Sequence, residues 1–204
     1  MRIRKDIGLS SLAQGVEVEG VTPGIFSLDV EFEASPGVTV LFGRSGSGKT
    51  TTLQLIAGLM RPDSGRIAIN GDALFDSDQR IDLPVRKRRV GYVFQNLALF
   101  PHISVRANVE FGIEAGSRRE RADRALRMME ALHIEHTAER LPREISGGEA
   151  QRAALARALC YGPRILLLDE PLSAIDESTK LGIIRDLKDL NRDLGLPIIY
   201  VTHS

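Results

Sequence analysis

The chain alternates compact apolar runs with stretches in which apolar residues recur every three or four positions. The compact runs predict buried strands at residues 38–42, 164–169 and 197–202, and shorter strands at 66–71 and 89–94. The helical spacing predicts helices at residues 49–58 and 176–194, and a helical segment across 104–145. Strands and helices that alternate in this order indicate a parallel α/β core, with the middle segment as an inserted helical subdomain.

Parts of this pattern also predict which faces are buried. The first 36 residues hold short alternating runs, such as residues 27–32, which predict strands of an antiparallel sheet with one face in water. The middle segment carries apolar residues at helical spacing, which predicts an amphipathic helix with a solvated basic face: Ala122, Ala125, Met129 and Leu132. The last helix is expected to bury one stripe, made of Leu181, Ile184, Leu187, Leu190 and Leu194.

The composition is that of a globular chain with one domain, or one domain and a subdomain. The 204 residues include 27 basic and 27 acidic ones, and the resulting zero net charge argues against a general nucleic-acid binder without excluding a local basic patch. No run approaches the roughly 20 apolar residues of a membrane span. The N-terminus has charges but no apolar region, so no signal peptide is expected. The single cysteine, Cys160, excludes an internal disulfide and fits a reducing cytosol.

Three further features have simple structural explanations. The basic run at residues 86–89 is interpreted as a solvated turn rather than as a nucleic-acid patch. His133 and His136 lie three residues apart but lack cysteine or acidic partners in a metal-ligand pattern. Cys160 is expected to be a small core residue.

Residues 43–50 carry the strongest chemical motif, because they match G-x-x-x-x-G-K-[ST] in full between a predicted strand and a predicted helix. Glycines let the backbone turn tightly and bring N–H groups against phosphate oxygens, and the helix directs the positive end of its dipole at the anion. Lys49 would neutralise the terminal phosphates, and the Thr50 hydroxyl can ligate Mg²⁺. The predicted nucleotide-binding residues are Gly43, Arg44, Ser45, Gly46, Ser47, Gly48, Lys49, Thr50 and Thr51.

Two carboxylates follow the apolar strand at residues 165–168, at the strand end where α/β proteins form ligand sites. Asp169 would hold Mg²⁺ through water, and Glu170 would polarise an attacking water as general base. Alternation along the strand end should send the two side chains in different directions. Alone, such a strand could simply end in solvated acids, but the phosphate loop in the same chain favours the catalytic interpretation.

Residues 145–152, which read Ile-Ser-Gly-Gly-Glu-Ala-Gln-Arg, resemble the signature motif of ATP-binding-cassette (ABC) ATPases. Gln95 is similar to the Q-loop glutamine of that family, residues 173–176 to its D-loop, and His203 to its switch histidine. With the phosphate loop, these motifs occur in the family's order, and the resemblance runs from about residue 38 to the end. It implies a P-loop NTPase fold with a RecA-like parallel core, an N-terminal antiparallel β subdomain and an inserted α-helical subdomain.

The resemblance also implies the domain organisation and the ligands. Residues 1–204 would form one ATP-binding domain, with the helical subdomain at approximately residues 96–145. Family members continue beyond the switch histidine with further helices, and many importers add a regulatory domain, so we expect both to be absent here. ATP and Mg²⁺ would be bound, with Thr50, Gln95 and Asp169 at the metal.

In this family two subunits stack head to tail, and each signature closes over the ATP held by the other subunit. Ser146 and Glu149 have the spacing of a capping box at a helix start. The backbone N–H groups of Gly147 and Gly148 would meet the partner's γ-phosphate, and Asp176 of the D-loop would join the nucleotide-binding residues. The resemblance implies that His203 contacts the γ-phosphate and that Gln95 is catalytic with Glu170 and His203.

The chain departs from the family pattern at three places. Ile145 replaces leucine, which preserves volume. Glu149 replaces the usual glutamine, which places a carboxylate near a polyphosphate. The aromatic residue on which the family stacks adenine is missing from residues 16–24, so Phe26 is the nearest candidate, with a plain core position as the alternative.

Residues 88–95 and 99–102 resemble bacterial importers for oxyanions, sugars and similar solutes, and residues 81–84 are most like the molybdate importer ATPase. The resemblance implies an ATPase subunit, peripheral on the cytoplasmic face of the inner membrane, that drives solute uptake, of molybdate or another oxyanion. Its partners would be a second copy, multi-span permease subunits and, indirectly, a solute-binding protein, with no nucleic acid.

Two other functions stay open as alternatives. A soluble ABC ATPase of the DNA-repair type would place a very long coiled coil between phosphate loop and signature, and a ribosome-type member would usually carry two cassettes. Here about a hundred residues, without a heptad run, separate Gly43 from Ser146, and there is one cassette. A nucleotide-binding regulator without turnover would predict the loss of Glu170 or His203, and both are present.

Overall fold

The computed structural model describes residues 16–17, 28–34, 37–172 and 175–202. The adenine candidate Phe26, the switch histidine His203 and the D-loop residues Ser173 and Ala174 lie outside these residues. Most of the first 36 residues, where an antiparallel sheet was expected, also lie outside them.

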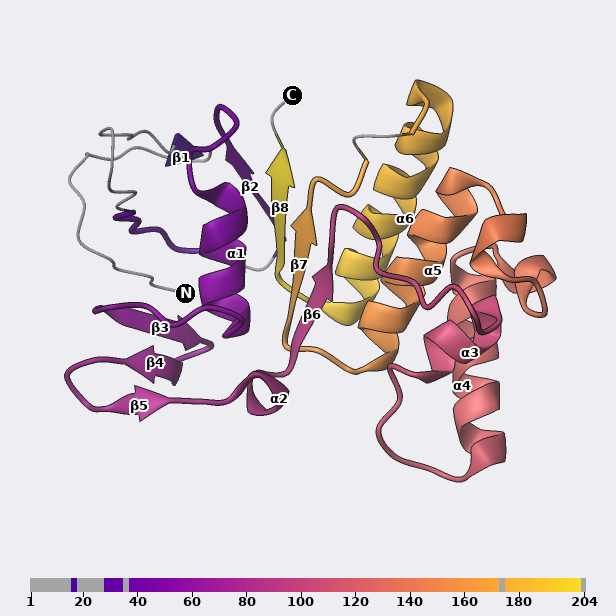
Figure 1. The fold of residues 1–204 in the computed structure, drawn as a ribbon, viewed down its shortest axis with the longest axis horizontal. Helices are drawn as coiled ribbons and strands as arrows, with labels where there is room; N and C mark the ends of the chain where they lie inside the picture. Colours follow the sequence, from indigo (N-terminus) through magenta and orange to yellow (C-terminus); the bar gives the residue numbers. More distant parts are fainter. Residues whose placement is uncertain (1–15, 18–27, 35–36, 173–174, 203–204) are drawn as a thin grey trace.

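A five-stranded parallel sheet forms the centre of the molecule (Figure 1). Its strand order is β1 (Val16–Glu17), β2 (Val38–Phe42), β8 (Ile198–Thr202), β7 (Ile165–Asp169) and β6 (Val90–Val93). Every neighbouring pair in this order is parallel. The predicted parallel α/β core is therefore confirmed, and β2, β6, β7 and β8 fall within a residue or so of the predicted strands.

Helices and a second sheet cover the two faces of this parallel sheet (Figure 1). Helix α1 (Lys49–Ala57) and an antiparallel sheet lie on one side; that sheet consists of β3 (Arg66–Ile69), β4 (Asp72–Asp76) and β5 (Ile81–Asp82). On the other side lie α3 (Val105–Glu110), α4 (Arg118–Ala131), α5 (Gly147–Cys160) and α6 (Glu177–Leu194). The short helices α2 (Val85–Arg88), η1 (Glu135–Thr137) and η2 (Pro142–Glu144) lie in the connections.

Strand β7 shows why its sequence is an unbroken apolar run. Ile165 and Leu167 belong to the hydrophobic cluster under α1, whereas Leu166 and Leu168 belong to the cluster under α5 and α6. Side chains alternate between the two faces of a strand, so a strand covered on both faces needs apolar residues at every position. Because β7 is packed between the two hydrophobic clusters, the positions of Asp169 at its end and of Glu170 after it are well determined.

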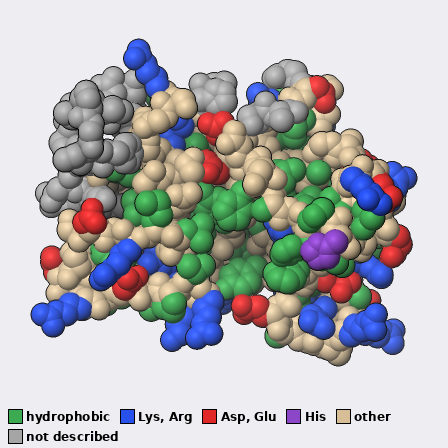
Figure 2. Space-filling model, viewed as in Figure 1, with side chains coloured by type: hydrophobic (Ala, Val, Ile, Leu, Met, Phe, Trp, Pro, Cys, Tyr) green, Lys and Arg blue, Asp and Glu red, His purple; other side chains and the backbone are tan. Residues whose placement is uncertain are grey.

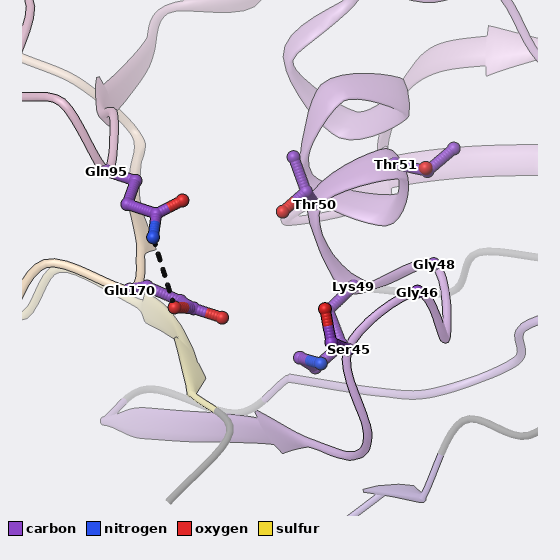
Figure 3. Close-up of a pocket in the computed structure, with 8 residues that line it drawn as sticks. All are labelled: Ser45, Gly46, Gly48, Lys49, Thr50, Thr51, Gln95 and Glu170. Atoms are coloured by element: carbon purple, nitrogen blue, oxygen red, sulfur yellow. Dashed lines mark hydrogen bonds between the residues drawn. The ribbon is translucent and has the colours of Figure 1, made fainter. Parts of the chain in front are cut away.

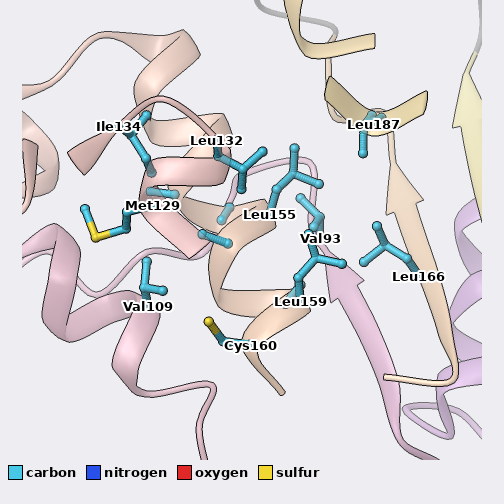
Figure 4. Packing of buried hydrophobic residues seen from close by; sticks show 14 of the residues in the cluster. Val93, Val109, Met129, Leu132, Ile134, Leu155, Leu159, Cys160, Leu166 and Leu187 are labelled. Carbon is cyan, nitrogen blue, oxygen red and sulfur yellow. The ribbon is translucent and has the colours of Figure 1, made fainter. Parts of the chain in front are cut away.

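The larger cluster joins α4 and α5 to the sheet (Figure 4). Ala125, Met129 and Leu132 are fully buried in it, as the helical spacing predicted, and Cys160 is a buried core residue. The stripe predicted for α6 is confirmed at Leu187, which is buried, and at Ile184, which packs against the cluster, but it is wrong at Leu181, which is 57% exposed. Ile183 is buried instead, and the side chains of Leu190 and Leu194 lie outside the described part of the helix. A spacing of four residues fits the 3.6-residue turn as well as a spacing of three does, so sequence alone does not choose between the two registers.

The predicted antiparallel sheet is present, but the described residues place it after the phosphate loop, and most of residues 1–36 lie outside them. It is formed by β3, β4 and β5, after the phosphate loop, and β1 joins the parallel sheet instead. Leu28, Val30 and Phe32 are buried while Glu31 is exposed, so the predicted alternation holds, but residues 28–34 pair with none of the strands in the described part of the chain. Alternation reports that one face is covered, and it does not report which neighbour, if any, supplies the hydrogen bonds.

The prediction of a solvated turn at residues 86–89 is wrong for one of the four side chains. Arg88 is only 1% exposed, and its guanidinium donates to the carbonyl oxygens of Leu55 and Ile56 at 2.9 and 3.0 Å. These carbonyls end helix α1, where the helix dipole favours a cation. Burial lowers the pKa of Arg88, while the carboxylate of Asp82, 3.1 Å away, acts in the opposite direction.

The visible surface mixes both signs of charge. Lysines, arginines and acidic residues are interspersed around its edge, with hydrophobic side chains toward the middle (Figure 2). Among the described residues, no helix combines the length and the apolar character needed to cross a membrane.

Candidate functional site

The loop between β2 and α1 forms the floor of the site. Gly48, at the residue before α1, has φ of 93°, a left-handed conformation that other residues adopt only with strain. This turn lets helix α1 begin directly at Lys49, so that its free N–H groups face the loop. The sequence prediction of a strand, a tight loop and a helix is confirmed at this place.

Lys49 supplies the positive charge of the loop. Its side chain curls back so that Nζ donates to the carbonyl oxygens of Gly43 and Arg44, each at 2.8 Å, and lies 3.5 Å from the Ser47 hydroxyl. The residue is 5% exposed. The ammonium group is thus held over the loop by two carbonyl oxygens and a hydroxyl, which are neutral and leave its positive charge in place.

A hydroxyl and a carboxylate meet beside this loop. The Thr50 hydroxyl donates to Asp169 Oδ1 at 2.9 Å, and the Tyr92 hydroxyl donates to Asp169 Oδ2 at 3.1 Å. Asp169 is 5% exposed at the end of β7. Mg²⁺ prefers hard oxygen ligands, and this pair of oxygen groups next to a phosphate loop fits that preference. Sequence analysis identified Thr50 and Asp169 but missed Tyr92.

Glu170 and Gln95 form the opposite wall. Gln95 Nε2 donates to Glu170 Oε2 at 3.4 Å, and both side chains face Lys49 and Thr50 across a pocket of about 500 Å³ (Figure 3). Glu170 has φ of 46°, and its backbone N–H donates to the Val201 carbonyl of β8 at 3.1 Å. The two carboxylates point in different directions, as predicted: Asp169 points to Thr50 and Tyr92, and Glu170 points to Gln95.

The pocket therefore unites part of the predicted site. Its lining residues are Ser45, Gly46, Gly48, Lys49, Thr50, Thr51, Gln95 and Glu170. They come from the phosphate loop and the start of α1, from the second residue after β6 and from the residue after β7. The signature residues and Asp176 do not line it.

Ser146 begins helix α5 as predicted, and the capping box is confirmed. The Glu149 backbone N–H donates to the Ser146 hydroxyl at 3.3 Å, and the Ser146 backbone N–H donates to Glu149 Oε2 at 2.7 Å. His136 Nε2 lies 2.8 Å from Glu149 Oε1. Hydrogen bonds from Ser146, and then the contact with His136, lower the pKa of the Glu149 carboxyl to about 2.

The two signature glycines have different surroundings. A Cβ on Gly148 would lie 2.6 Å from Thr179 Cγ2, which is closer than two carbons can approach, whereas a Cβ on Gly147 would meet nothing within 4 Å. Gly148 thus lets the start of α5 pack against the start of α6, and Gly147 faces open space. An ion pair between Arg152 and Asp186 also joins these two helices.

Asp176 has a local structural role in this chain. Its carboxylate caps helix α6, accepting from the Thr179 backbone N–H at 3.0 Å and from the Ser178 hydroxyl at 2.6 Å. These hydrogen bonds lower the pKa of Asp176. These local contacts do not test the predicted nucleotide-binding role of Asp176, which stays a prediction.

The chain is similar to ATP-binding proteins of transporters. The family described as ABC transporter matches residues 28–173. A molybdenum import ATP-binding protein, ModC, of Paramagnetospirillum magneticum is 51% identical over 181 residues, which cover 89% of this chain and 50% of that protein. The ModC of Rhizobium meliloti is 47% identical, with 89% and 51% covered. The chain thus spans about half the length of the curated relatives it matches.

Solved structures show the same architecture. The dimeric post-hydrolysis state of the ATP-binding cassette MJ0796, bound to ADP and Pi, aligns with a TM-score of 0.76 and 32% identity, and the match covers 100% of this chain and 88% of that one. A second dimeric structure of MJ0796, described as a bacterial ABC transporter cassette, aligns equally well.

Proposed function

The chain belongs to the ABC transporter family. From this premise we propose that it binds ATP with Mg²⁺ and hydrolyses the bond between the β- and γ-phosphates to drive a membrane importer. One observation carries the proposal. The phosphate loop with Lys49 faces Glu170 and Gln95 across a single pocket, and Thr50 and Asp169 meet at its edge.

The binding roles follow from the contacts. The loop N–H groups and Lys49 would hold the β- and γ-phosphates, with Lys49 exchanging its carbonyl acceptors for phosphate oxygens. Thr50 and Asp169 would hold Mg²⁺, with Gln95 completing the set. When bound, the metal would neutralise charge on the phosphates.

Hydrolysis requires a base that faces the phosphate. Glu170 fits this role, because its carboxylate lies on the wall of the pocket opposite Lys49 and Thr50. Gln95 would orient Glu170 and the attacking water through its amide. His203 is proposed to contact the γ-phosphate from the end of β8.

We further propose a head-to-tail dimer that forms with ATP. The pocket is built without Ser146, Gly147, Gly148 and Glu149, and Gly147 leaves open space at the start of α5. A second copy could therefore place these N–H groups against the γ-phosphate. The dimeric assemblies of the MJ0796 cassette support this arrangement.

The relatives' names support molybdate, or a similar oxyanion, as the transported solute. The chain would then act with multi-span permease subunits, and indirectly with a solute-binding protein, from the cytoplasmic face of the membrane. Import is favoured over a soluble ABC ATPase that acts on nucleic acid or ribosomes. Co-purification with the permease, followed by molybdate-stimulated ATPase assays in vesicles, tests this part, and ATP turnover indifferent to permease and molybdate would contradict it.

Equilibrium binding of labelled ATP tests the role of the phosphate loop. Lys49→Ala should abolish tight binding, because it removes the ammonium group held over the loop. Lys87→Ala, which removes an exposed lysine from α2, is the control. Equal affinity in Lys49→Ala and the control would contradict the proposed site.

Single-turnover hydrolysis tests the base. Glu170→Gln should keep ATP binding but slow hydrolysis by about 10²–10⁴-fold, because glutamine keeps the shape and cannot accept a proton. The ATP-bound dimer should then accumulate. If Glu170→Gln hydrolysed ATP at the parent rate, Glu170 would not be the general base.

Sedimentation with ATP tests the dimer. Ser146→Arg should block association, because the bulky side chain fills the space at the start of α5. Ser117→Arg is a matched control, since Ser117 begins α4 with the same capping box and its loss should cost a similar cap energy. If both variants dimerise like the parent, the signature does not close over a partner's nucleotide.

A further inference from the structure

We propose that Tyr92 is a positioning residue of the magnesium site, whose hydroxyl fixes the Asp169 carboxylate so that Asp169 and Thr50 are oriented toward the metal. The inference rests on the proposed function, because the metal is the one expected to accompany ATP. It adds a residue from β6, a strand that contributes no other side chain to the metal.

The sheet register places Tyr92 within reach of Asp169. Tyr92 pairs with Leu167 in the neighbouring parallel strand, and Asp169 lies two residues further along β7. Residues two apart in a strand share a face and are about 7 Å apart, which a tyrosine side chain can span. The hydroxyl accordingly reaches Asp169 Oδ2 at 3.1 Å, leaving Oδ1 for Thr50.

The tyrosine ring is itself held firmly. It packs against the hydrophobic cluster under α1 and lies against Phe94, with ring centroids 4.3 Å apart. A half-buried tyrosine hydroxyl needs a partner, and Asp169, which is 5% exposed, has little access to water that could replace this donor. The Tyr92 hydroxyl is the donor in this contact, because an ionised carboxylate can only accept a hydrogen bond.

The three groups form a directed chain of hydrogen bonds. Tyr92 donates to Asp169, and Thr50 donates to the other oxygen of the same carboxylate. Because the Thr50 proton is used toward Asp169, the lone pairs of its oxygen point elsewhere and can serve a metal. If the Asp169 carboxylate rotated, the Asp169 and Thr50 oxygens would both lose their orientation toward the metal. Outer hydrogen bonds of this kind typically change metal affinity by about 10–100-fold.

The test substitutes Tyr92→Phe, which keeps the ring and removes only the hydroxyl. Mn²⁺ serves as the probe: it is titrated into the full chain with an equimolar non-hydrolysable ATP analogue, and free Mn²⁺ is read from its electron paramagnetic resonance signal. We expect the Mn²⁺ dissociation constant to rise about tenfold, with analogue affinity in EDTA unchanged. Tyr161→Phe is the matched control, since it also removes one tyrosine hydrogen bond, to the Arg86 carbonyl at 2.8 Å.

The outcomes separate this inference from the proposed function. If the parent chain binds the analogue and Mn²⁺, and Tyr92→Phe has the same Mn²⁺ affinity as Tyr161→Phe, or a tighter one, the positioning role is refuted. If the parent fails to bind the analogue, the proposed function itself fails. Weakened analogue binding in EDTA would show that Tyr92 supports the whole pocket rather than the metal, and would also overturn the inference.

Discussion

Replacing Arg88 should destabilise the protein far more than its place in an exposed basic run suggests. The side chain is 1% exposed and donates four hydrogen bonds. Its acceptors are the carbonyls of Leu55, Ile56 and Leu83 and the carboxylate of Asp82. Arg88 therefore ties the end of α1 to β5 and to the connection after it.

The magnitude follows from what Arg88→Ala would leave behind. Each buried acceptor without a donor costs about 1–3 kcal/mol. The Ile56 carbonyl accepts no other hydrogen bond from the described residues outside α1. A cation at a partly buried helix end contributes up to about 2 kcal/mol. Asp82 keeps its ion pair with Arg61 at 3.2 Å, so no unpaired buried carboxylate adds to the loss. We expect the free energy of unfolding to fall by about 3–5 kcal/mol, as when one partner of a buried pair is removed.

Urea unfolding followed by circular dichroism measures this loss. Lys87→Ala and Arg86→Ala are controls from the same short helix, and both should stay within about 0.5 kcal/mol of the parent. Arg88→Lys keeps the charge but not the planar fork, so losing two hydrogen bonds should cost about 2 kcal/mol. If Arg88→Ala were as stable as the controls, the guanidinium would not anchor α1.

Two further predictions concern the start of α5. Gly148→Ala should destabilise by about 1–3 kcal/mol through the contact with Thr179, whereas Gly147→Ala should be neutral or stabilising by up to about 1 kcal/mol; urea unfolding of the pair checks this, and equal effects would refute the packing argument. The pKa of Glu149 is lowered from 4.5 to about 2, so its carboxylate stabilises the folded state above pH 4.5 and loses this effect as the pH falls toward 2. The stability difference between the parent and Glu149→Gln should shrink between about pH 6 and about pH 3, and a constant difference would contradict it.

Much of the fold was predictable because its signals are local. A strand covered on both faces needs an unbroken apolar run, and β7 has one. Turn, helix start and phosphate-binding geometry are specified by neighbouring residues in the loop before Lys49. The capping box of Ser146 and Glu149 is likewise closed within four residues. Such features depend on chain periodicity and on short-range hydrogen bonds, which do not change with the wider packing.

The errors fell where distant segments meet. The exposure of Leu181 depends on which side of α6 faces the sheet, and the parallel pairing of β1 with β2 depends on which strands become neighbours. The burial of Arg88 depends on α2 lying against the end of α1. No residue pattern within these segments contains that information.

Residue patterns alone were enough to predict the main strands of the parallel sheet, the loop and helix at Lys49, and Asp169 and Glu170 as the acids beside that loop. Which groups meet there is set by the tertiary structure: Glu170 lies beside Gln95, and the register of β6 on β7 brings Tyr92 to Asp169. The physical reason is that a motif fixes chemistry over a few residues, whereas a hydrogen bond across 77 positions exists only after the sheet has chosen its neighbours.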